Sequence, residues 1–457
     1  MPVQGNPAAD AAKGTTGSFS SILQSYVYAS GIHKPEVSNV LSYKFPQYYM
    51  TSLLDRLGSY EAIGQDTWTW WTQDRTRLGG VVASVANNTT ATANFEVVAY
   101  AYGSPTGQIG YALVGDILRL ESGILAKVTV VAQGSSDSNA QKLTVVRPDG
   151  TDFTVALLDD ADTFGHIGTA FEEASSAPGT RLYIPDEEIG YLQIMRRSFE
   201  ISGSEFTNKT WLGDGSAWYW TKEDLEMKEF ARDKEGIVMF GEGTSSGTTK
   251  TTKGIFDYAD ASGVKNGFVC ATGVSETDIQ DHIKDMLIQG VSNEILVLCG
   301  AQFLADFQRA MRDYHVGGAI SFGSFGANLV GLDVQRYSFM GKIINIVYYE
   351  LFDDSAMVPA PLGNSVSSSI YTFTNLSLWI DMGSDSSGKK LISLKYKEHD
   401  GQSRKFIHAY EVGMMNPSGV NGGMVANGKD SFKIHYLCEV GVEVRLSNRL
   451  GLLRATS

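Results

Sequence analysis

The sequence lacks several features that would place it in a common functional class. It has only three cysteines, which lie far apart and form no CxxC pair: Cys270, Cys299 and Cys438. An odd number of distant cysteines predicts reduced thiols rather than a disulfide framework or a zinc site. No apolar run is as long as the roughly 18 residues of a membrane-spanning helix, and residues 1–18 contain no apolar secretion signal.

Clustered positive charge is also missing. The net charge is −14, from 37 Lys and Arg against 51 Asp and Glu, and no block of five or six basic residues occurs. Because neutralising a phosphate backbone requires clustered Lys and Arg, we do not expect direct recognition of nucleic acid. The 43% apolar and 19% charged residues are typical of a folded protein, and 457 residues suggest roughly two to three domains.

Two formal catalytic motifs lack the surroundings that their chemistry needs. The sequence "GTSSG" at 243–247 fits GxSxG, but a nucleophile elbow requires a following helix, and here "TTKTTKG" follows. The sequence "GMVANGKD" at 423–430 resembles a phosphate-binding loop, yet Asp430 replaces the magnesium-binding hydroxyl and a strand follows. We expect residues 241–254, rich in Gly, Ser, Thr and Lys, to form a flexible loop. We therefore predict no catalytic residues.

The spacing of histidines and acids does not indicate a metal site. No two of the seven histidines lie within four positions, which excludes an HExxH motif. Asp159, Asp160 and Asp162, or Asp353 and Asp354, could hold a hard cation. Solvated turns are the simpler interpretation, so we expect neither a metal nor a cofactor.

The chain alternates between β-rich and helical patterns. Short β-branched and aromatic runs fill residues 65–185, and the densest of them predict a small antiparallel β-subdomain near 107–157. Thr221, followed by Asp224, resembles a capping box and predicts a helix over 221–235.

The region after residue 264 reads as a mixed α/β domain. Apolar residues at helical spacing predict two amphipathic helices, one over 275–290 with Ser275 as its cap and one over 301–314. The sequence "EILVLCG" between them is typical of a buried strand. Near the C-terminus, "SFKIHYLCEVGVEVRL" at 431–446 alternates apolar and polar residues, which predicts one long strand with one face on a core.

The least ordinary stretch is "QDTWTWWTQDR" at 65–75, which places Trp68, Trp70 and Trp71 within four positions. Its alternation predicts a strand with a tryptophan-rich face. That face either packs inside its own domain or is covered by a neighbouring subunit, since tryptophan is enriched at subunit contacts. The sequence pattern alone leaves both alternatives open.

The order of these elements resembles that of the major capsid proteins of tailed bacteriophages, the HK97-fold family. The sequence "RRSFEISGSEF" with "TKEDLEMKEFARDKEGIVMF" resembles the start of the spine helix of that family. The sequence "VGDILRLESGILAKVTVV", continuing to "RPDG", resembles a small β-insert, and "SFKIHYLCEVGVEVRLSNRLGLL" is similar to the closing peripheral strand.

The resemblance implies an α+β, HK97-like capsid fold. Its parts would be an N-terminal arm (1–57), an extended β-loop (58–190) with a small β-insert near 107–157, a peripheral domain with a peripheral sheet (191–264 and 386–457) and a spine helix (221–235), and a mixed α/β axial domain (265–385).

The resemblance also implies a function: self-assembly, through hexameric and pentameric capsomers, into an icosahedral shell that encloses double-stranded phage DNA without sequence-specific binding. The partners would be further copies of the chain and separate scaffolding, portal and decoration proteins, with no membrane. The protein would be made in the bacterial host cytoplasm and end in the virion capsid.

The resemblance places the tryptophans at the start of a loop that reaches over a neighbour. The implied subunit-interface residues are Trp68, Trp70, Trp71, Tyr48 and Tyr49, with Trp70 and Trp71 exposed in an isolated subunit.

One competing interpretation is a carbohydrate-active or hydrolytic protein with a tryptophan stacking platform and acids among Asp159, Asp160 and Asp162. Another is a phage tail or baseplate protein.

Overall fold

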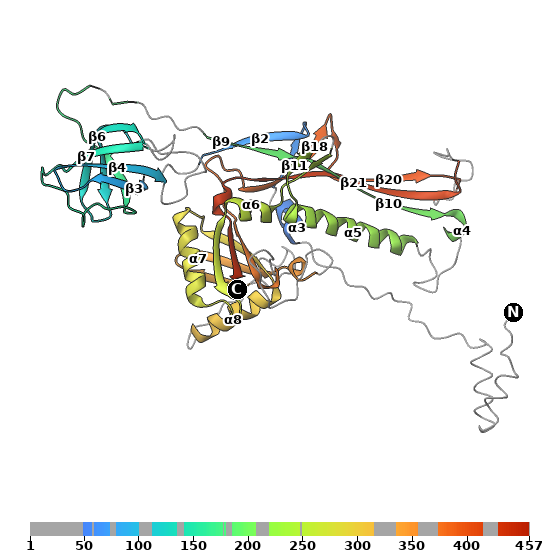
Figure 1. The fold of residues 1–457 in the computed structure, drawn as a ribbon. Coiled ribbons are helices and arrows are strands. Elements are labelled where there is room, and N and C mark those ends of the chain that lie inside the picture. The colour runs from blue at the N-terminus through green and yellow to red at the C-terminus, as the bar shows by residue number, and fades with distance from the viewer. Residues whose placement is uncertain are drawn as a thin grey trace, which may run out of the picture. The chain divides into compact units, whose positions relative to one another are not determined.

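The computed structural model describes residues 49–56, 59–73, 79–99, 112–134, 141–176, 178–179, 185–206, 219–246, 249–314, 335–354, 373–414 and 428–456 (Figure 1). The chain divides into two compact units. The described residues of the first unit lie within Arg197–Phe230 and His408–Tyr436. Those of the second unit lie within Pro46–Arg196, Ala231–Ile407 and Leu437–Ser457.

The first unit packs a helix against strands. Its elements are β10 (Gln193–Ser202), α4 (Gly203–Phe206), α5 (Tyr219–Phe240), β20 (Ile407–Val412) and β21 (Ser431–Val444), of which β10, α5, β20 and β21 extend into the second unit. Both β10 and β20 pair with β21. Phe230 of α5 stacks on Tyr436 with ring centroids 6.0 Å apart. Arg197 of β10 bonds Glu226 at 2.6 Å and also pairs with Glu229.

Helix α5 confirms the predicted helix but is longer at both ends. Because it begins at Tyr219, Thr221 lies inside the helix, and the predicted capping box at its start is wrong. At the other end the helix continues through Gly236 to Phe240. Val238 and Met239 are fully buried there, and such packing outweighs the cost of about 1 kcal/mol for a glycine within a helix.

A closed barrel forms the first part of the second unit. Its six strands follow the order β3-β4-β7-β6-β5-β8. They are β3 (Gly79–Asn87), β4 (Thr92–Ala99), β5 (Asp116–Leu120), β6 (Leu125–Gln133), β7 (Gln141–Val146) and β8 (Thr163–Thr169). Alternate residues such as Phe95, Leu118 and Val145 fill its interior.

The predicted β-insert near 107–157 therefore includes β5, β6 and β7 but misses three strands. The barrel closes where β3 pairs with β8, with Gly79 opposite Gly165. This pairing joins residues more than 80 positions apart, which local alternation does not reveal.

A mixed six-stranded sheet lies elsewhere in the second unit. Its order is β13-β22-β17-β14-β16-β15. The strands are β13 (Val264–Val269), β14 (Glu294–Cys299), β15 (Gln335–Phe339), β16 (Lys342–Tyr348), β17 (Leu376–Asp381) and β22 (Gly451–Thr456). Strand β22, which the sequence analysis grouped with the peripheral domain, pairs with β13 and β17 and so belongs to this sheet.

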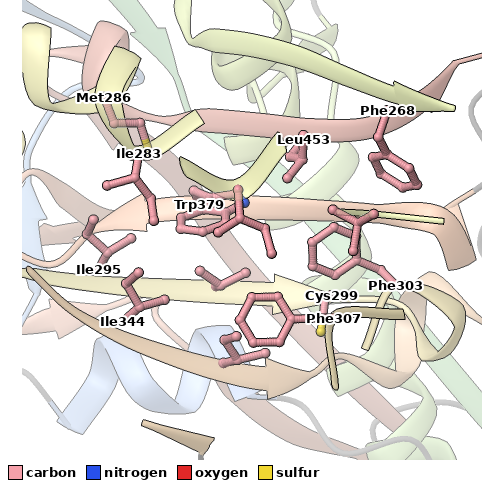
Figure 2. Packing of buried hydrophobic residues seen from close by; sticks show 14 of the residues in the cluster. Phe268, Ile283, Met286, Ile295, Cys299, Phe303, Phe307, Ile344, Trp379 and Leu453 are labelled. Carbon is pink, nitrogen blue, oxygen red and sulfur yellow. The ribbon is translucent and has the colours of Figure 1, made fainter. Parts of the chain in front are cut away.

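Helices α7 (Glu276–Ile288) and α8 (Ala301–Tyr314) confirm the two amphipathic helices predicted for this region. Ser275 caps α7 in a complete capping box with Asp278. The buried faces of both helices and the sheet share one core, in which Trp379 lies among aliphatic and aromatic side chains (Figure 2). Helix α6 (Ile255–Ser262) and the short 3-10 turns Glu350–Phe352, Phe373–Asn375 and Ser447–Arg449 complete the elements around it.

The peripheral sheet contains β1 (Tyr60–Ile63), β18 (Ile392–His399), β21 and β10 in that order, with the short β19 (Gln402–Ser403) beside β18. The first half of β21 alternates as predicted, but every residue from Glu439 to Val444 is buried. The prediction of one polar face is wrong for this half. Its acids are paired inside the sheet: Glu443 lies 3.0 Å from Lys395, and Glu439 bonds Arg404.

The chain enters the described region through α3 (Tyr49–Arg56). Residues 1–48 of the predicted arm lie outside the described residues. Among the residues of the predicted arm that the structure describes, Met50 and Leu54 are buried. The carboxylate of Glu235 accepts hydrogen bonds from the backbone N–H groups of Met50 and Thr51, both at 2.9 Å, and from the Tyr349 hydroxyl at 2.8 Å.

We expect Glu235→Gln to lower the free energy of unfolding of the unassembled subunit by about 2–3 kcal/mol, because hydrogen bonds to a buried charged group contribute about 1.5–3 kcal/mol each. Denaturant unfolding measures this. The exposed Glu242 supplies a matched control, since Glu242→Gln should change stability by no more than about 0.5 kcal/mol. Equal, small effects of the two substitutions would contradict the anchoring role of Glu235.

Stability should also depend on pH through His282 of α7, which is fully buried against Trp379. Burial lowers the pKa of His282 to about 3, whereas an unfolded histidine titrates near 6.5. Above about pH 7 both states are neutral. Below about pH 6.5 only the unfolded state takes up the proton, so the free energy of unfolding should fall by about 1.4 kcal/mol per pH unit.

Denaturant unfolding at pH 7 and pH 5 measures this loss, which should reach about 2 kcal/mol. His282→Gln should remove the corresponding part of the pH dependence whatever its effect on stability at pH 7. His399→Gln changes an exposed histidine and should keep the dependence. Identical pH dependence in the wild type and the His282 variant would show that this residue does not cause it.

Candidate subunit interface

The tryptophan-rich stretch forms β2 (Thr67–Thr72), which pairs antiparallel with β9 (Asp186–Tyr191) in a two-stranded ribbon. Trp68 lies opposite Gly190, Trp70 opposite Glu188, and Trp71 opposite Glu187. Directly opposed residues of an antiparallel pair project to the same side. The ribbon therefore has an inner face with Trp68 and Trp70 and an outer face with Trp71.

The inner face packs within its own chain. Trp70 is only 5% exposed, and its ring lies 6.2 Å from that of Trp68 and 6.5 Å from that of Tyr258. The ring of Trp68 fits against two glycines. A Cβ atom at either Gly190 or Gly441 would come within 2.3 Å of that ring. Both glycines are thus needed for a close approach of the indole.

The outer face is open. Trp71 is 59% exposed and Ile189 of β9 is 50% exposed. Thr67 and Thr69 on the same face are exposed as well, and so is Glu187. We define the outer ribbon face as these five residues with Tyr191. Trp71 and Ile189 are diagonal neighbours across the two strands, and exposed apolar side chains that adjoin one another make a candidate interaction surface.

The structure separates the predicted interface residues. Trp70 was expected to be exposed in an isolated subunit, and this is wrong because its ring packs on Tyr258 inside the chain. Trp68 is half-buried on the same inner face, and Trp71 alone of the three projects outward. Tyr48 lies outside the described residues, and Tyr49 begins α3. Sequence reasoning missed Ile189, whose strand has no comparable aromatic signal.

These positions argue against a stacking platform made of the three tryptophans. A platform needs rings exposed on one side, whereas Trp68 and Trp70 face inward and Trp71 faces outward. The aspartates considered as catalytic acids instead accept backbone hydrogen bonds within the barrel. Asp160 accepts a hydrogen bond from the Val85 N–H at 2.7 Å, and Asp162 accepts one from the Asp159 N–H at 2.7 Å.

The GxSxG motif also has no catalytic setting. The segment expected to be a flexible loop contains a hairpin of β11 (Thr244–Ser246) and β12 (Thr249–Thr251), so that expectation is wrong. Ser245 pairs with Lys250 across the hairpin. The hydroxyls of Thr244 and Thr251 lie 3.0 Å apart and help to hold the two strands together.

Other features of the described residues concern metals, thiols and membranes. No group of three or more His, Cys, Asp or Glu side chains there is arranged to hold a metal ion.

All three cysteines are free, as predicted; Cys299 and Cys438 are buried, and burial raises the pKa of Cys438 to about 11. Among the helices that the structure describes, none combines the length and the apolar character needed to span a membrane.

The chain belongs to the SU10 major capsid protein family, whose model matches residues 14–361. It is therefore a shell-forming major capsid protein of a virion. No curated protein matches the sequence significantly. The α+β architecture, with its long helix α5, its mixed sheet and the returning strand β21, confirms the HK97-like capsid fold expected from the sequence.

Several solved capsid structures are similar to this chain. The capsid of a native GTA particle is 10% identical, with 94% of this chain and 97% of that chain covered and a TM-score of 0.41. A chain of Mycobacterium phage Ogopogo is 11% identical, with coverage of 94% and 99% and a TM-score of 0.41. The capsid of Cyanophage P-SCSP1u is 10% identical, with coverage of 93% of both chains and a TM-score of 0.39. The family match, and not these distant likenesses, carries the assignment.

Replacing Trp70 tests the division of the ribbon into two faces. Trp70→Ala should lower the free energy of unfolding of the lone subunit by about 3–5 kcal/mol, the usual cost of deleting a buried tryptophan ring. Thr69→Ala, one position away on the outer face, should change it by no more than about 0.5 kcal/mol. Thermal and denaturant unfolding of the unassembled subunit measure both. A neutral Trp70→Ala would mean that the inner face is not core.

Proposed function

We propose that copies of this chain assemble through hexameric and pentameric capsomers into an icosahedral shell that encloses double-stranded DNA, and that the outer ribbon face is one of the contacts between subunits. The observation that carries the proposal is the exposure of Trp71 on a strand whose other face is core. In a protein that builds a shell from copies of itself, a neighbouring copy is the surface available to cover that ring.

The energy of the contact suits a repeated interface. Burying one tryptophan ring contributes on the order of 2–3 kcal/mol, and central interface tryptophans cost 2 kcal/mol or more when cut to alanine. Ile189, half exposed beside it, adds apolar area on the same face. A single contact of this size is weak, but every subunit repeats it, so the closed shell is stable while the free subunit stays soluble.

The remaining parts of the proposal follow from the family. Residues 1–57 serve as the arm, 58–190 as the extended loop, and 265–385 as most of the axial domain, with the barrel inside the extended loop. The protein acts structurally and not as an enzyme. Separate scaffolding, portal and decoration proteins take part in assembly, which begins in the host cytoplasm. The net charge of −14 favours a shell that does not adhere to the DNA inside it.

Trp71→Ala provides the test. The substitution should leave the thermal midpoint of the unassembled subunit nearly unchanged, because the ring is exposed there. It should raise the protein concentration needed for assembly by about tenfold or more, since the loss of about 2 kcal/mol recurs at each copy. Light scattering and electron microscopy measure assembly. Normal shells at the wild-type concentration would rule out the outer ribbon face as a subunit contact.

A further inference from the structure

The outer ribbon face combines apolar area with negative charge. Trp71 lies directly opposite Glu187, and Glu187 is followed two residues later by Ile189 on the same side of β9. The side chain of Glu187 is exposed and makes no ion pair with any residue that the structure describes. A partner that covers Trp71 and Ile189 must therefore also meet an unpaired carboxylate.

A surface that combines apolar area with positive charge lies on β10. Ile194 is 51% exposed, and Arg196, two residues later on the same side of the strand, is exposed too. Within the described part of the chain Arg196 has no ion-pair partner. An exposed isoleucine beside an unpaired arginine offers what the outer ribbon face lacks: apolar area next to positive charge.

The two surfaces also match in spacing. Glu187 and Ile189 lie two residues apart on β9, as Ile194 and Arg196 do on β10, which is roughly 6.6–7 Å along an extended strand in both cases. When the two strands lie across each other, Ile189 can therefore contact Ile194 while Glu187 reaches Arg196. The contact is heterologous, joining two different patches, which is the type of contact that builds rings.

We propose that the outer ribbon face of one subunit docks on the exposed face of β10 in a second copy of this chain, with Glu187 paired to Arg196 and with Trp71 and Ile189 packed over Ile194. This inference rests on the proposed function, because it names the surface that covers Trp71. A two-fold contact of the outer ribbon face with itself is disfavoured, since it would bring the carboxylates of Glu187 together.

A rival receiving surface lies on the barrel. Arg119 of β5 is exposed and lies directly opposite Leu125 of β6, which is 41% exposed. Opposed residues of neighbouring strands are only about 4.5–5.5 Å apart. The wider separation of Glu187 and Ile189 along one strand fits this pair less well than it fits Ile194 and Arg196.

Charge reversal distinguishes these surfaces. Glu187→Arg and Arg196→Glu should each raise the concentration needed for assembly by about tenfold or more, because each places like charges together. The double variant restores opposite charges and should return to within about threefold of the wild type. Glu172→Arg, at an exposed position on another segment, is the control for the change in net charge. Thermal midpoints of the unassembled subunits should stay unchanged throughout.

Three outcomes would overturn the inference. The first is normal assembly of both single charge-reversal variants. The second is a double variant no better than the worse single variant. The third is rescue of Glu187→Arg by Arg119→Glu, which would assign the barrel as the receiving surface. If Trp71→Ala impairs assembly while the charge reversals have no effect, the proposed function stands and only the partner surface is wrong. If Trp71→Ala is neutral, the outer ribbon face is not a subunit contact, and that part of the proposed function fails together with this inference.

Crosslinking gives an independent readout. Chains with Ile189→Cys and chains with Ile194→Cys, co-assembled and mildly oxidised, should yield covalent dimers that reducing agent separates. Shells of either variant alone should yield few, because each carries the new thiol on only one of the two surfaces. Cys299 and Cys438 are buried and Cys270 is half-buried, so oxidised wild-type shells measure the background from native thiols. Equal dimer formation in the mixed and single shells would contradict the proposed contact.

Discussion

The carboxylate of Glu235 ties together three segments that are distant in sequence. It is fully buried on α5, and it accepts two backbone N–H groups at the start of α3 and the hydroxyl of Tyr349. Burial, and then the charge of Glu235, raise the pKa of Tyr349 well above its usual value, so the hydroxyl remains a donor. An eight-residue helix is not stable alone, so α3 depends on this anchor and on the burial of Met50 and Leu54. A buried charge in turn needs its donors.

Elements with local signals could be predicted from the sequence, and those closed by distant partners could not. Helix α7 carries its own cap in Ser275 and Asp278 together with a helical apolar spacing, so its residues suffice to define it. Strand β21 alternates in sequence throughout, yet its second half is buried on both faces because cations from other segments neutralise Glu439 and Glu443. Nothing in the alternation of β21 identifies Lys395 or Arg404 as partners.

The tryptophans show the same limit at the candidate site. Alternation correctly predicted a strand, and with it two faces, but it could not say which face is core. That answer depends on β9, on Tyr258 and on two glycines. Gly190 and Gly441 are the signal that could have been read, since a glycine within a strand often marks a close approach of another group. Here the approaching group is the ring of Trp68.

In the proposed contact, adjacent residues of strand β2 have two different roles. Trp70 stabilises the fold of each subunit before assembly, whereas Trp71 is held outward by the same backbone and gains its burial only when another surface covers it. Because the inner face is fixed by packing, the backbone at Trp71 is held in place, and less backbone entropy remains to be lost on contact. A shell built from many weak contacts needs this rigidity, since a flexible loop would lose much of the small free energy that each contact supplies.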